Sequence, residues 1–375
     1  MGLLVLAVAG RADEATAVKA IQKLGGFVIV DEDRPEKPVV RVDFYPRNKP
    51  VRDAALKELK NFKCLQEVQL DRTQTTDAAL RTLREIGLLH ALANATAKDG
   101  NRPSGPGDVT RLDLCLTPVT DSGLKELKEL KGLTSLQLGG VKVTDSGLKE
   151  LKELKGLREL NLAGTPVTGA GLKELKDLSN LRRLYLFRSA VTDSGLKEIE
   201  ELRSLQSLVL NSTPVTDEGL KKLKNLKSLQ TLELSGTKVT GTGLEGLPSL
   251  QVLRLDYTQT SDAGLKAITQ LKGLQVLNLG KTQITDEGLK DLRNLTRLKE
   301  LDLNRTEVTS TGLKELKNLK SLQTLDLTLT LITDSGINEL KDLKNLKRLN
   351  LLYISLTERV ITELQAALPE LQIVR

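Results

Sequence analysis

Pairs of leucines that flank a single residue recur at a fixed interval along most of the chain. They begin at Leu112, Leu136, Leu160, Leu184, Leu208, Leu232, Leu253, Leu277, Leu301, Leu325 and Leu349. Successive pairs start 24 residues apart, except for the step from position 232 to position 253, which spans 21 residues. A fixed period of this size predicts a solenoid, in which each repeat forms one coil and packs on its two neighbours.

Each repeat changes its hydrophobic period once. Residues 133–138 end in a leucine pair, and this period of two predicts a short strand with one buried face. Leucines then recur in steps of three over residues 148–154, which predicts a short helix. Between the two, Thr144 is suited to cap the helix, and Asp145 at the first helical position favours the positive end of the helix dipole. One coil therefore consists of a strand, a cap and a helix.

The motif I-T-D-x-G-L is intact at residues 284–289 and recurs with small changes along the chain. It resembles the motif of the cysteine-containing subclass of leucine-rich repeats found in F-box substrate receptors, here with 24-residue repeats of bacterial type. The resemblance covers roughly residues 40–375. It implies an α/β leucine-rich-repeat solenoid, a horseshoe with a parallel sheet on its concave face and short helices on its convex face.

The cysteine that ends the strands of this subclass is mainly replaced here by threonine, and the chain carries no recognisable F-box. The threonines are Thr117, Thr165, Thr213, Thr237, Thr258, Thr282, Thr306 and Thr330. A small hydroxyl at this place can hydrogen-bond to the backbone as the chain turns.

The N-terminal region does not follow the repeat. Residues 12–24 predict a helix that ends at two glycines, and residues 27–30 and 39–44 predict two strands that pair through the loop between them. We expect residues 13–45 to form an α/β cap over the first coil and residues 46–375 to form the solenoid. Residues 360–375, about one truncated unit, would form a second cap at the other end.

The repeat is interrupted twice. A helix capped by Thr76 is expected to run through Leu92, followed by an insertion at about residues 88–108 whose stretch 101–107 is predicted to be a mobile loop by its proline and glycine content. We expect the solenoid to continue across the insertion; the alternative is a break into two domains. The coil at residues 240–250 is three residues short and is expected to lose about one helical turn, to change the local curvature and to form the weakest junction.

Charge and composition disfavour nucleic-acid binding and a transmembrane segment but leave the other function classes undecided. The 375 residues carry a net charge of +7, largely from lysines that alternate with glutamates on the predicted helices. This pattern indicates a solvated convex face or, alternatively, a surface for an acidic partner. The predicted helix face has no aromatic residues for stacking, which disfavours specific nucleic-acid binding. No apolar run reaches the ~18 residues of a membrane helix, so no transmembrane segment is predicted.

The sequence is compatible with more than one cellular compartment. Residues 1–12 resemble a clipped secretory signal but lack a basic stretch at the start, and the alternative is an uncleaved apolar segment packed against the cap. Exported or periplasmic and cytoplasmic locations are both compatible with this sequence. Cys64 and Cys115 are expected to point to opposite faces and to be free thiols.

No set of residues with catalytic spacing emerges, so we predict a protein that is not an enzyme and uses no cofactor and no metal. The single histidine, His90, has no nucleophile placed beside it, and residues 280–282 lack the upstream glycine of a phosphate-binding loop. The recurring aspartates are explained by their position at helix starts rather than by calcium; they are Asp121, Asp145, Asp193, Asp217 and Asp286.

The predicted function is a non-catalytic scaffold, expected to be monomeric, that binds a protein partner on the concave face. The alternatives are a substrate receptor or adaptor like the F-box proteins, and an exported carbohydrate or small-ligand receptor. An aromatic content of 2% disfavours sugar binding.

The residues between and just after the paired leucines should point out of the concave sheet, and most of them are small or polar. Large side chains gather at two places, and these are the candidate partner-binding residues Arg183, Tyr185, Phe187, Arg188, Arg254, Tyr257, Lys281 and Arg305. Tyrosine and arginine are enriched at binding hot spots. The two groups begin three strands apart, ~15 Å, which is within one interface. The alternative is that variation between coils left a few large side chains on a solvent-exposed face.

Overall fold

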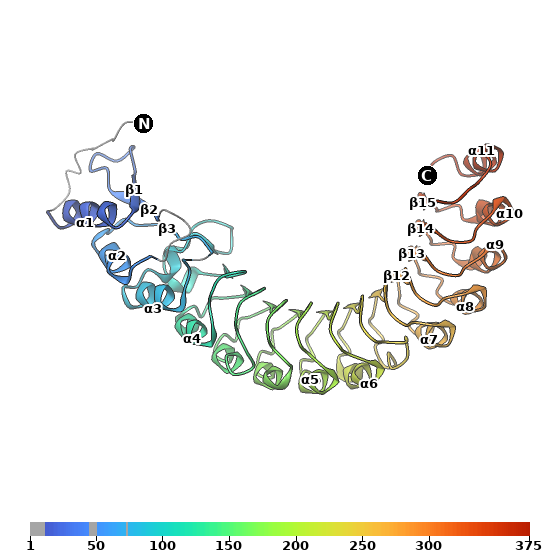
Figure 1. Ribbon diagram of the computed structural model, residues 1–375, viewed down its shortest axis with the longest axis horizontal. Coiled ribbons are helices and arrows are strands. Elements are labelled where there is room, and N and C mark those ends of the chain that lie inside the picture. Colours follow the sequence, from blue (N-terminus) through green and yellow to red (C-terminus); the bar gives the residue numbers. More distant parts are fainter. Residues whose placement is uncertain (1–11, 45–50, 73) are drawn as a thin grey trace. The chain divides into compact units, whose positions relative to one another are not determined.

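The computed structural model describes residues 12–44, 51–72 and 74–375. The chain forms two compact units, Met1–Val167 and Thr168–Arg375. The division falls inside the predicted solenoid, where the leucine pairs keep their 24-residue step from Leu160 to Leu184. Within each unit the strands line one face and the helices line the other (Figure 1).

The N-terminal elements match the predicted ones closely. Helix α1 (Ala12–Lys23) is followed by β1 (Gly26–Val30) and β2 (Val39–Phe44), and the two strands pair in antiparallel fashion. Strand β2 also pairs in parallel with β3 (Glu67–Gln69), the first strand of the repeat type. The apolar stripe of α1 buries Ala17 and Ile21, because these residues lie on one helical face.

The first unit continues as alternating strands and short helices. Its helices are α2 (Asp53–Glu58), α3 (Asp77–Glu85) and α4 (Asp121–Leu124). Its remaining strands are β4 (Ala95–Thr96), β5 (Arg111–Asp113), β6 (Ser135–Gln137) and β7 (Glu159–Asn161), of which β5, β6 and β7 run parallel with their leucine pairs in register. The helix expected near residues 148–154 is a short 3-10 helix at Leu148–Leu151.

The insertion is built differently from the prediction. Helix α3 ends at Glu85 rather than continuing through Leu92, because Gly87 adopts a left-handed conformation with φ of 76° and turns the chain away. Strand β4 follows and pairs antiparallel with β5. Arg102 ties the 101–107 loop down: its guanidinium donates to the Ala93 carbonyl at 2.7 Å and forms an ion pair with Glu67 at 3.1 Å. The loop predicted to be mobile therefore has specific anchors.

The second unit carries nine strands in sequential parallel order. They are β8 (Arg183–Tyr185), β9 (Ser207–Val209), β10 (Thr231–Glu233), β11 (Val252–Arg254), β12 (Val276–Asn278), β13 (Glu300–Asp302), β14 (Thr324–Asp326), β15 (Arg348–Asn350) and β16 (Gln372–Val374). Their leucine pairs stay in register, including Leu232 beside Leu253 across the short step. These leucines are almost wholly buried and form the core.

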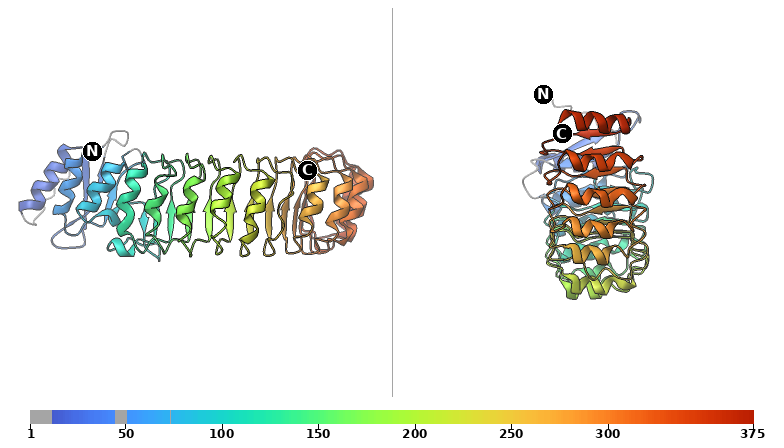
Figure 2. Two further views of the ribbon diagram at one scale, coloured as in Figure 1. Left: turned by 90° about the horizontal axis from the view of Figure 1, so that it is seen from below. Right: turned by 90° about the vertical axis from the view of Figure 1, so that its right-hand side faces the viewer.

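The helices of the second unit lie side by side on the opposite face from the sheet (Figure 2). They are α5 (Asp193–Glu198), α6 (Asp217–Leu220), α7 (Asp262–Ile268), α8 (Asp286–Leu292), α9 (Ser310–Leu313), α10 (Asp334–Asn338) and α11 (Glu358–Ala367). Between β10 and β11 the chain forms turns and no helix, which confirms the predicted loss in the short coil. Gly241, Gly243 and Gly246 adopt positive φ values there.

The T-D-x-G-L motif is explained by contacts between neighbouring coils. The Asp286 carboxylate accepts hydrogen bonds from the backbone N–H of Thr309 at 2.8 Å and from its hydroxyl at 2.5 Å. Gly312 packs against the same carboxylate, where a Cβ atom would collide. We call this arrangement a rung, and its aspartates are Asp77, Asp121, Asp193, Asp217, Asp262, Asp286 and Asp334.

The rungs change the expected role of the recurring aspartates, and they bear on the expected continuation of the solenoid across the insertion. The aspartates do stand at helix starts, but their carboxylates serve the following coil rather than their own helix. Across the insertion, the Asp77 carboxylate accepts from the Thr120 N–H at 2.8 Å, so the coils on its two sides are bonded to each other within the first unit. In the residues that the structure describes, no group of histidine, cysteine and acidic side chains is arranged to hold a metal ion.

Candidate functional site

The candidate site lies where each strand ends. After the second leucine of a pair the chain turns, and a buried threonine closes the turn. The Thr306 hydroxyl donates to the Leu303 carbonyl three residues back at 2.6 Å. The same bond is made by Thr117, Thr165, Thr213, Thr237, Thr258, Thr282 and Thr330, and by Ser189, which the sequence reading did not include. The predicted role of the hydroxyl is confirmed.

The residue just before each of these hydroxyls adopts a left-handed backbone conformation. We call these positions in the second unit the exit row, which consists of Arg188, Ser212, Gly236, Tyr257, Lys281, Arg305 and Leu329, together with Tyr353, which has the same backbone conformation and precedes Ile354 instead of a hydroxyl residue. Their φ values lie between 53° and 68°. Backbone bonds join the row from coil to coil, as the Tyr257 N–H donates to the Gly280 carbonyl and the Lys281 N–H to the Asn304 carbonyl. The row is therefore a regular extension of the sheet.

Large side chains are unusual in this conformation. A left-handed residue with a Cβ atom costs about 1–2 kcal/mol, and glycine avoids that cost. In the first unit the equivalent positions hold Leu116, Gly140 and Gly164, and the two glycines show that the turn itself needs no side chain. The exit row nevertheless holds tyrosine, lysine, arginine and leucine, and the exposed fractions are 56% for Tyr257 and 81% for Tyr353.

Two pairs of neighbouring side chains stack a cation on an aromatic ring. The Lys281 ammonium lies 4.6 Å from the centre of the Tyr257 ring, on the next coil. The Arg188 guanidinium lies 4.8 Å from the centre of the Phe187 ring. These contacts hold the charged groups over the turn, where they stay accessible.

The last residues of β12, β13 and β14 form a second, partly acidic set of side chains. The Asp302 carboxylate accepts from the Asn304 N–H at 2.9 Å, and the Asp326 carboxylate accepts from the Thr328 N–H at 2.8 Å. Asn278 makes the equivalent bond to Gly280. Burial raises the pKa of Asp302, and the neighbouring carboxylates of Asp326 and Asp256 act in the same direction. These side chains shape the strand ends, and a cavity of about 150 Å³ lies over them.

All eight predicted site residues lie on the strand side of the second unit. Arg183 and Tyr185 belong to β8, while Arg188, Tyr257, Lys281 and Arg305 stand in the exit row. Phe187 and Arg254 are half-buried, and Arg254 lies 3.8 Å from a Glu233 carboxylate oxygen. The two groups begin on β8 and β11, three strand steps apart, with Ser212 and Gly236 of the exit row between them.

Sequence reasoning places Tyr353 in the exposed columns without including it in the site, and it misses Leu329. Leu329 and Tyr353 complete the exit row over the next two coils, and Leu331 nearby is 66% exposed. The signal for Leu329 was available, because Leu329 precedes Thr330 as Lys281 precedes Thr282. The signal was overlooked because Leu329 resembles a core leucine in a leucine-rich sequence.

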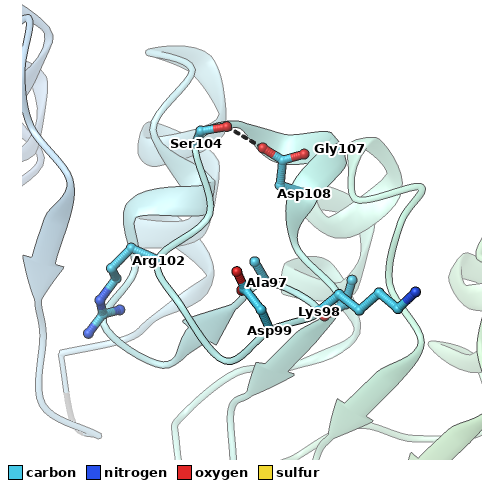
Figure 3. Close-up of a pocket in the computed structure, with 8 residues that line it drawn as sticks. Ala97, Lys98, Asp99, Arg102, Ser104, Gly107 and Asp108 are labelled. Carbon is cyan, nitrogen blue, oxygen red and sulfur yellow. Dashed lines mark hydrogen bonds between the residues drawn. The ribbon is translucent and has the colours of Figure 1, made fainter.

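A larger hollow in the first unit does not present converging groups. It has a volume of about 740 Å³ and is lined by side chains of the insertion, among them Lys98, Asp99 and Arg102. Figure 3 shows Lys98 and Arg102 pointing to opposite sides of it. Arg102 is occupied by backbone carbonyls and by Glu67, and Ser104 is bonded to Asp108.

The groups considered for catalysis lie apart from the exit row or form part of its turns. His90 lies on a 3-10 helix at Leu89–Ala91, and burial lowers its pKa. Cys64 and Cys115 are free thiols, and burial raises the pKa of Cys115, which disfavours the reactive thiolate. Residues 280–282 form a strand-exit turn in which the Thr282 hydroxyl donates to Leu279. Among the helices of the described part of the chain, none is long and apolar enough to cross a membrane.

Comparisons with known proteins agree with this architecture. Models of leucine-rich repeats match residues 248–308, 201–224 and 225–247. A search of curated proteins finds no match. The matching models describe leucine-rich repeats in general and do not single out the cysteine-containing subclass. The protein is thus a leucine-rich-repeat solenoid, a class that typically serves in protein–protein interaction rather than in catalysis.

Solved structures show the same fold. An internalin from Listeria monocytogenes is 20% identical with a TM-score of 0.57, and the match covers 99% of this chain and 98% of that one. A leucine-rich-repeat protein of Leptospira interrogans is 23% identical with a TM-score of 0.53, over 96% and 98% of the two chains. The PEPR1–AtPEP1 structure is 17% identical with a TM-score of 0.52, over 97% of this chain and 55% of that one.

Proposed function

We propose that the protein is a non-catalytic scaffold that binds a protein partner on the strand-lined face of its second unit. The contact residues are Arg183, Tyr185, Phe187, Arg188, Arg254, Tyr257, Lys281 and Arg305. The observation that carries the proposal is the exit row, in which exposed large side chains occupy a backbone conformation that favours glycine. Local strain of this kind is concentrated at functional sites.

Charge supports an acidic or mixed partner surface. Within the described residues, Arg188, Lys281 and Arg305 form no ion pair with a carboxylate of this chain. The acidic side chains beside them are engaged elsewhere, as in the bond from the Ser235 hydroxyl to Asp256 at 2.6 Å. A partner that brings carboxylates to the exit row would meet cations already held in place, which lowers the entropic cost of binding.

The alternatives have less support. The T-D-x-G-L motif behind the likeness to F-box receptors is accounted for by the rungs, so it reports packing and not an adaptor role. A sugar receptor would present several flat aromatic rings side by side, whereas this face offers Tyr185 and Phe187 on one coil and then Tyr257 and Tyr353 singly on distant coils. PEPR1 is solved as a complex with AtPEP1, but a likeness of 17% identity bears on the fold alone.

The test begins with affinity capture of a partner by the whole protein, followed by titration of the purified partner. Replacing Tyr185 by alanine and Arg188 by glycine should weaken binding by at least ~2 kcal/mol, which is the range of hot-spot residues. The melting temperature should be nearly unchanged, because glycine fits the left-handed turn at position 188.

A matched control places the charge change on the helix face of the same unit, with Lys222 and Lys224 both replaced by glutamate. Both lysines are exposed and lie on the 3-10 helix Lys221–Asn225. The control should bind normally. If the control loses binding and the strand-face variant keeps it, the partner docks on the helices and the proposal is wrong.

A further inference from the structure

The exit row from Tyr257 to Tyr353 is unbroken over five consecutive coils. Each position holds a side chain other than glycine, and every one of these side chains is exposed: Tyr257, Lys281, Arg305, Leu329 and Tyr353. The polarity of the side chains changes along the row. Its first part combines an aromatic ring with two cations, and its second part is apolar.

The apolar part is wider than the row itself. Leu331 is 66% exposed and stands two residues after Leu329, at a position where the three preceding coils carry the polar residues Gln259, Gln283 and Glu307. Leu329 and Tyr353 are 40% and 81% exposed. Three large apolar side chains are thus gathered on two neighbouring coils, which is a feature of interaction surfaces rather than of a solvated edge.

The cationic part is preorganised and lacks counter-charges. Lys281 is held over the Tyr257 ring at 4.6 Å, and within the described part of the chain neither Lys281 nor Arg305 pairs with a carboxylate. Carboxylates of a partner would supply the complementary charge.

The dimensions suit an extended segment. Neighbouring coils are ~4.8 Å apart at the sheet, so the row spans ~19 Å, and an extended chain covers that length with about six residues at ~3.3 Å each. A segment laid across the coils would place acidic residues over Lys281 and Arg305 and apolar residues over Leu329, Leu331 and Tyr353.

We propose that this part of the exit row is a docking track for an extended protein segment in which an acidic stretch adjoins an apolar one. The proposal rests on the proposed function and extends it, because it names the partner's chemistry and adds Leu329, Leu331 and Tyr353 to the site.

Labelled synthetic peptides of eight residues test the proposal with the whole protein. Two peptides carry an acidic and an apolar block in either order, a third alternates the same residues, and a fourth is acidic throughout. Fluorescence anisotropy should show one block peptide binding at least about tenfold more tightly than the alternating and the acidic peptides.

Two double variants then separate the halves of the track. Lys281→Gly with Arg305→Gly should weaken the block peptide at least about tenfold, and so should Leu329→Gly with Tyr353→Gly, while only the first pair should affect the acidic peptide. Glycine suits the backbone at all four positions, so unfolding is not an explanation for the loss. The helix-face variant Lys314→Glu with Lys317→Glu should bind as the unaltered protein does.

Three outcomes would overturn the proposal. The first is equal binding of the block and alternating peptides. The second is binding to vesicles of phosphatidylcholine and phosphatidylserine that the same variants abolish, which would make the track a membrane contact. The third is a captured partner whose affinity depends on Tyr185 and Arg188 but not on Lys281, Arg305, Leu329 or Tyr353. In that third case the proposed function stands and only this inference fails.

Discussion

The two edges of each coil obey different rules. At the helix-start edge, Asp286, Thr309 and Gly312 interlock across two coils, and each of them requires the others. At the strand-exit edge, the turn has a left-handed residue followed in most coils by a buried hydroxyl, and the side chain of the left-handed residue faces solvent. The first edge therefore keeps the same residue types in most coils, whereas the side chain at the second edge varies from coil to coil. Specific recognition is accordingly expected at the second edge.

The largest expected effect comes from breaking the first edge. Replacing Gly312 by valine drives the new side chain into the Asp286 carboxylate and the Leu289 side chain. Overpacking of this kind costs about 1–3 kcal/mol, and the strained rung adds to it. Thermal unfolding followed by circular dichroism should show a clearly lower melting temperature. The comparison variant is Gly236→Ala at the other edge, where the nearest atom is 3.5 Å away and only backbone strain opposes the change. Equal losses in the two variants would refute the distinction between the edges.

The next effect concerns the coils where the interlock is missing. Gly241 stands where the motif has aspartate, so the short coil makes no rung to the coil that begins at Ser261. Fewer bonds between coils should lower the free energy of local opening there. Hydrogen exchange should be faster for amides of residues 240–250 than for residues 285–295, which carry the Asp262 rung. Equal protection would show that side-chain packing alone holds the junction.

A smaller effect is expected from the hydroxyl that closes each turn. Replacing Thr306 by valine keeps the shape of the side chain but leaves the Leu303 carbonyl without its 2.6 Å bond. The loss of one buried hydrogen bond costs about 1–3 kcal/mol. Serine at the same position should keep most of the stability, as Ser189 makes this bond naturally. Urea unfolding of the two variants measures the difference.

The smallest effect is a pair of opposite pH dependences. The hydroxyl and the backbone N–H of Thr357 lower the pKa of Asp334, on the first edge. A carboxyl with a lowered folded pKa stabilises the fold above its ordinary pKa, and the contribution is lost as the pH falls through the lowered value. Asp334→Asn should therefore lower the melting temperature near neutral pH and matter little in strong acid.

Asp302, on the strand face, should behave in the reverse way. Burial raises its pKa, so the folded state binds the proton more readily than the unfolded chain does. Its contribution favours folding below the ordinary pKa of aspartate and is lost as the pH rises through the raised folded value. Asp302→Asn keeps the acceptor for the Asn304 N–H and should raise the melting temperature near neutral pH. Melting curves at several pH values for both variants check the two signs.

Much of the fold could be predicted from the sequence because its main determinants are periodic. Leu136 and Leu138 mark a strand by their spacing, and residues 284–289 mark the start of a helix. The prediction of a helix through Leu92 failed because Gly87, a single residue, ends α3. The rungs were not anticipated, since Asp286 and Thr309 are 23 residues apart and their bond exists only once the coils stack.

The candidate site could be predicted only in part. Tyr257 and Lys281 were recognised because large polar or aromatic residues stand out in a leucine-rich background. Their left-handed backbone was not recognised, because glycine usually announces that conformation and these positions carry other residues. Leu329 was overlooked for the opposite reason, as its side chain resembles those of the core.

The rungs join successive coils by the same contact, so in this respect the coils are interchangeable where both rungs are present. Where the rungs are present on both sides, a coil offers a carboxylate to the coil after it and receives one from the coil before it, as the coil of Thr285 and Asp286 does. An in-frame duplication of the 24 residues from Thr285 to Val308 would leave each copy of Thr285 with a carboxylate acceptor. The solenoid could thus be lengthened at this place with its rungs kept, and the exit row would gain one side chain with each added coil.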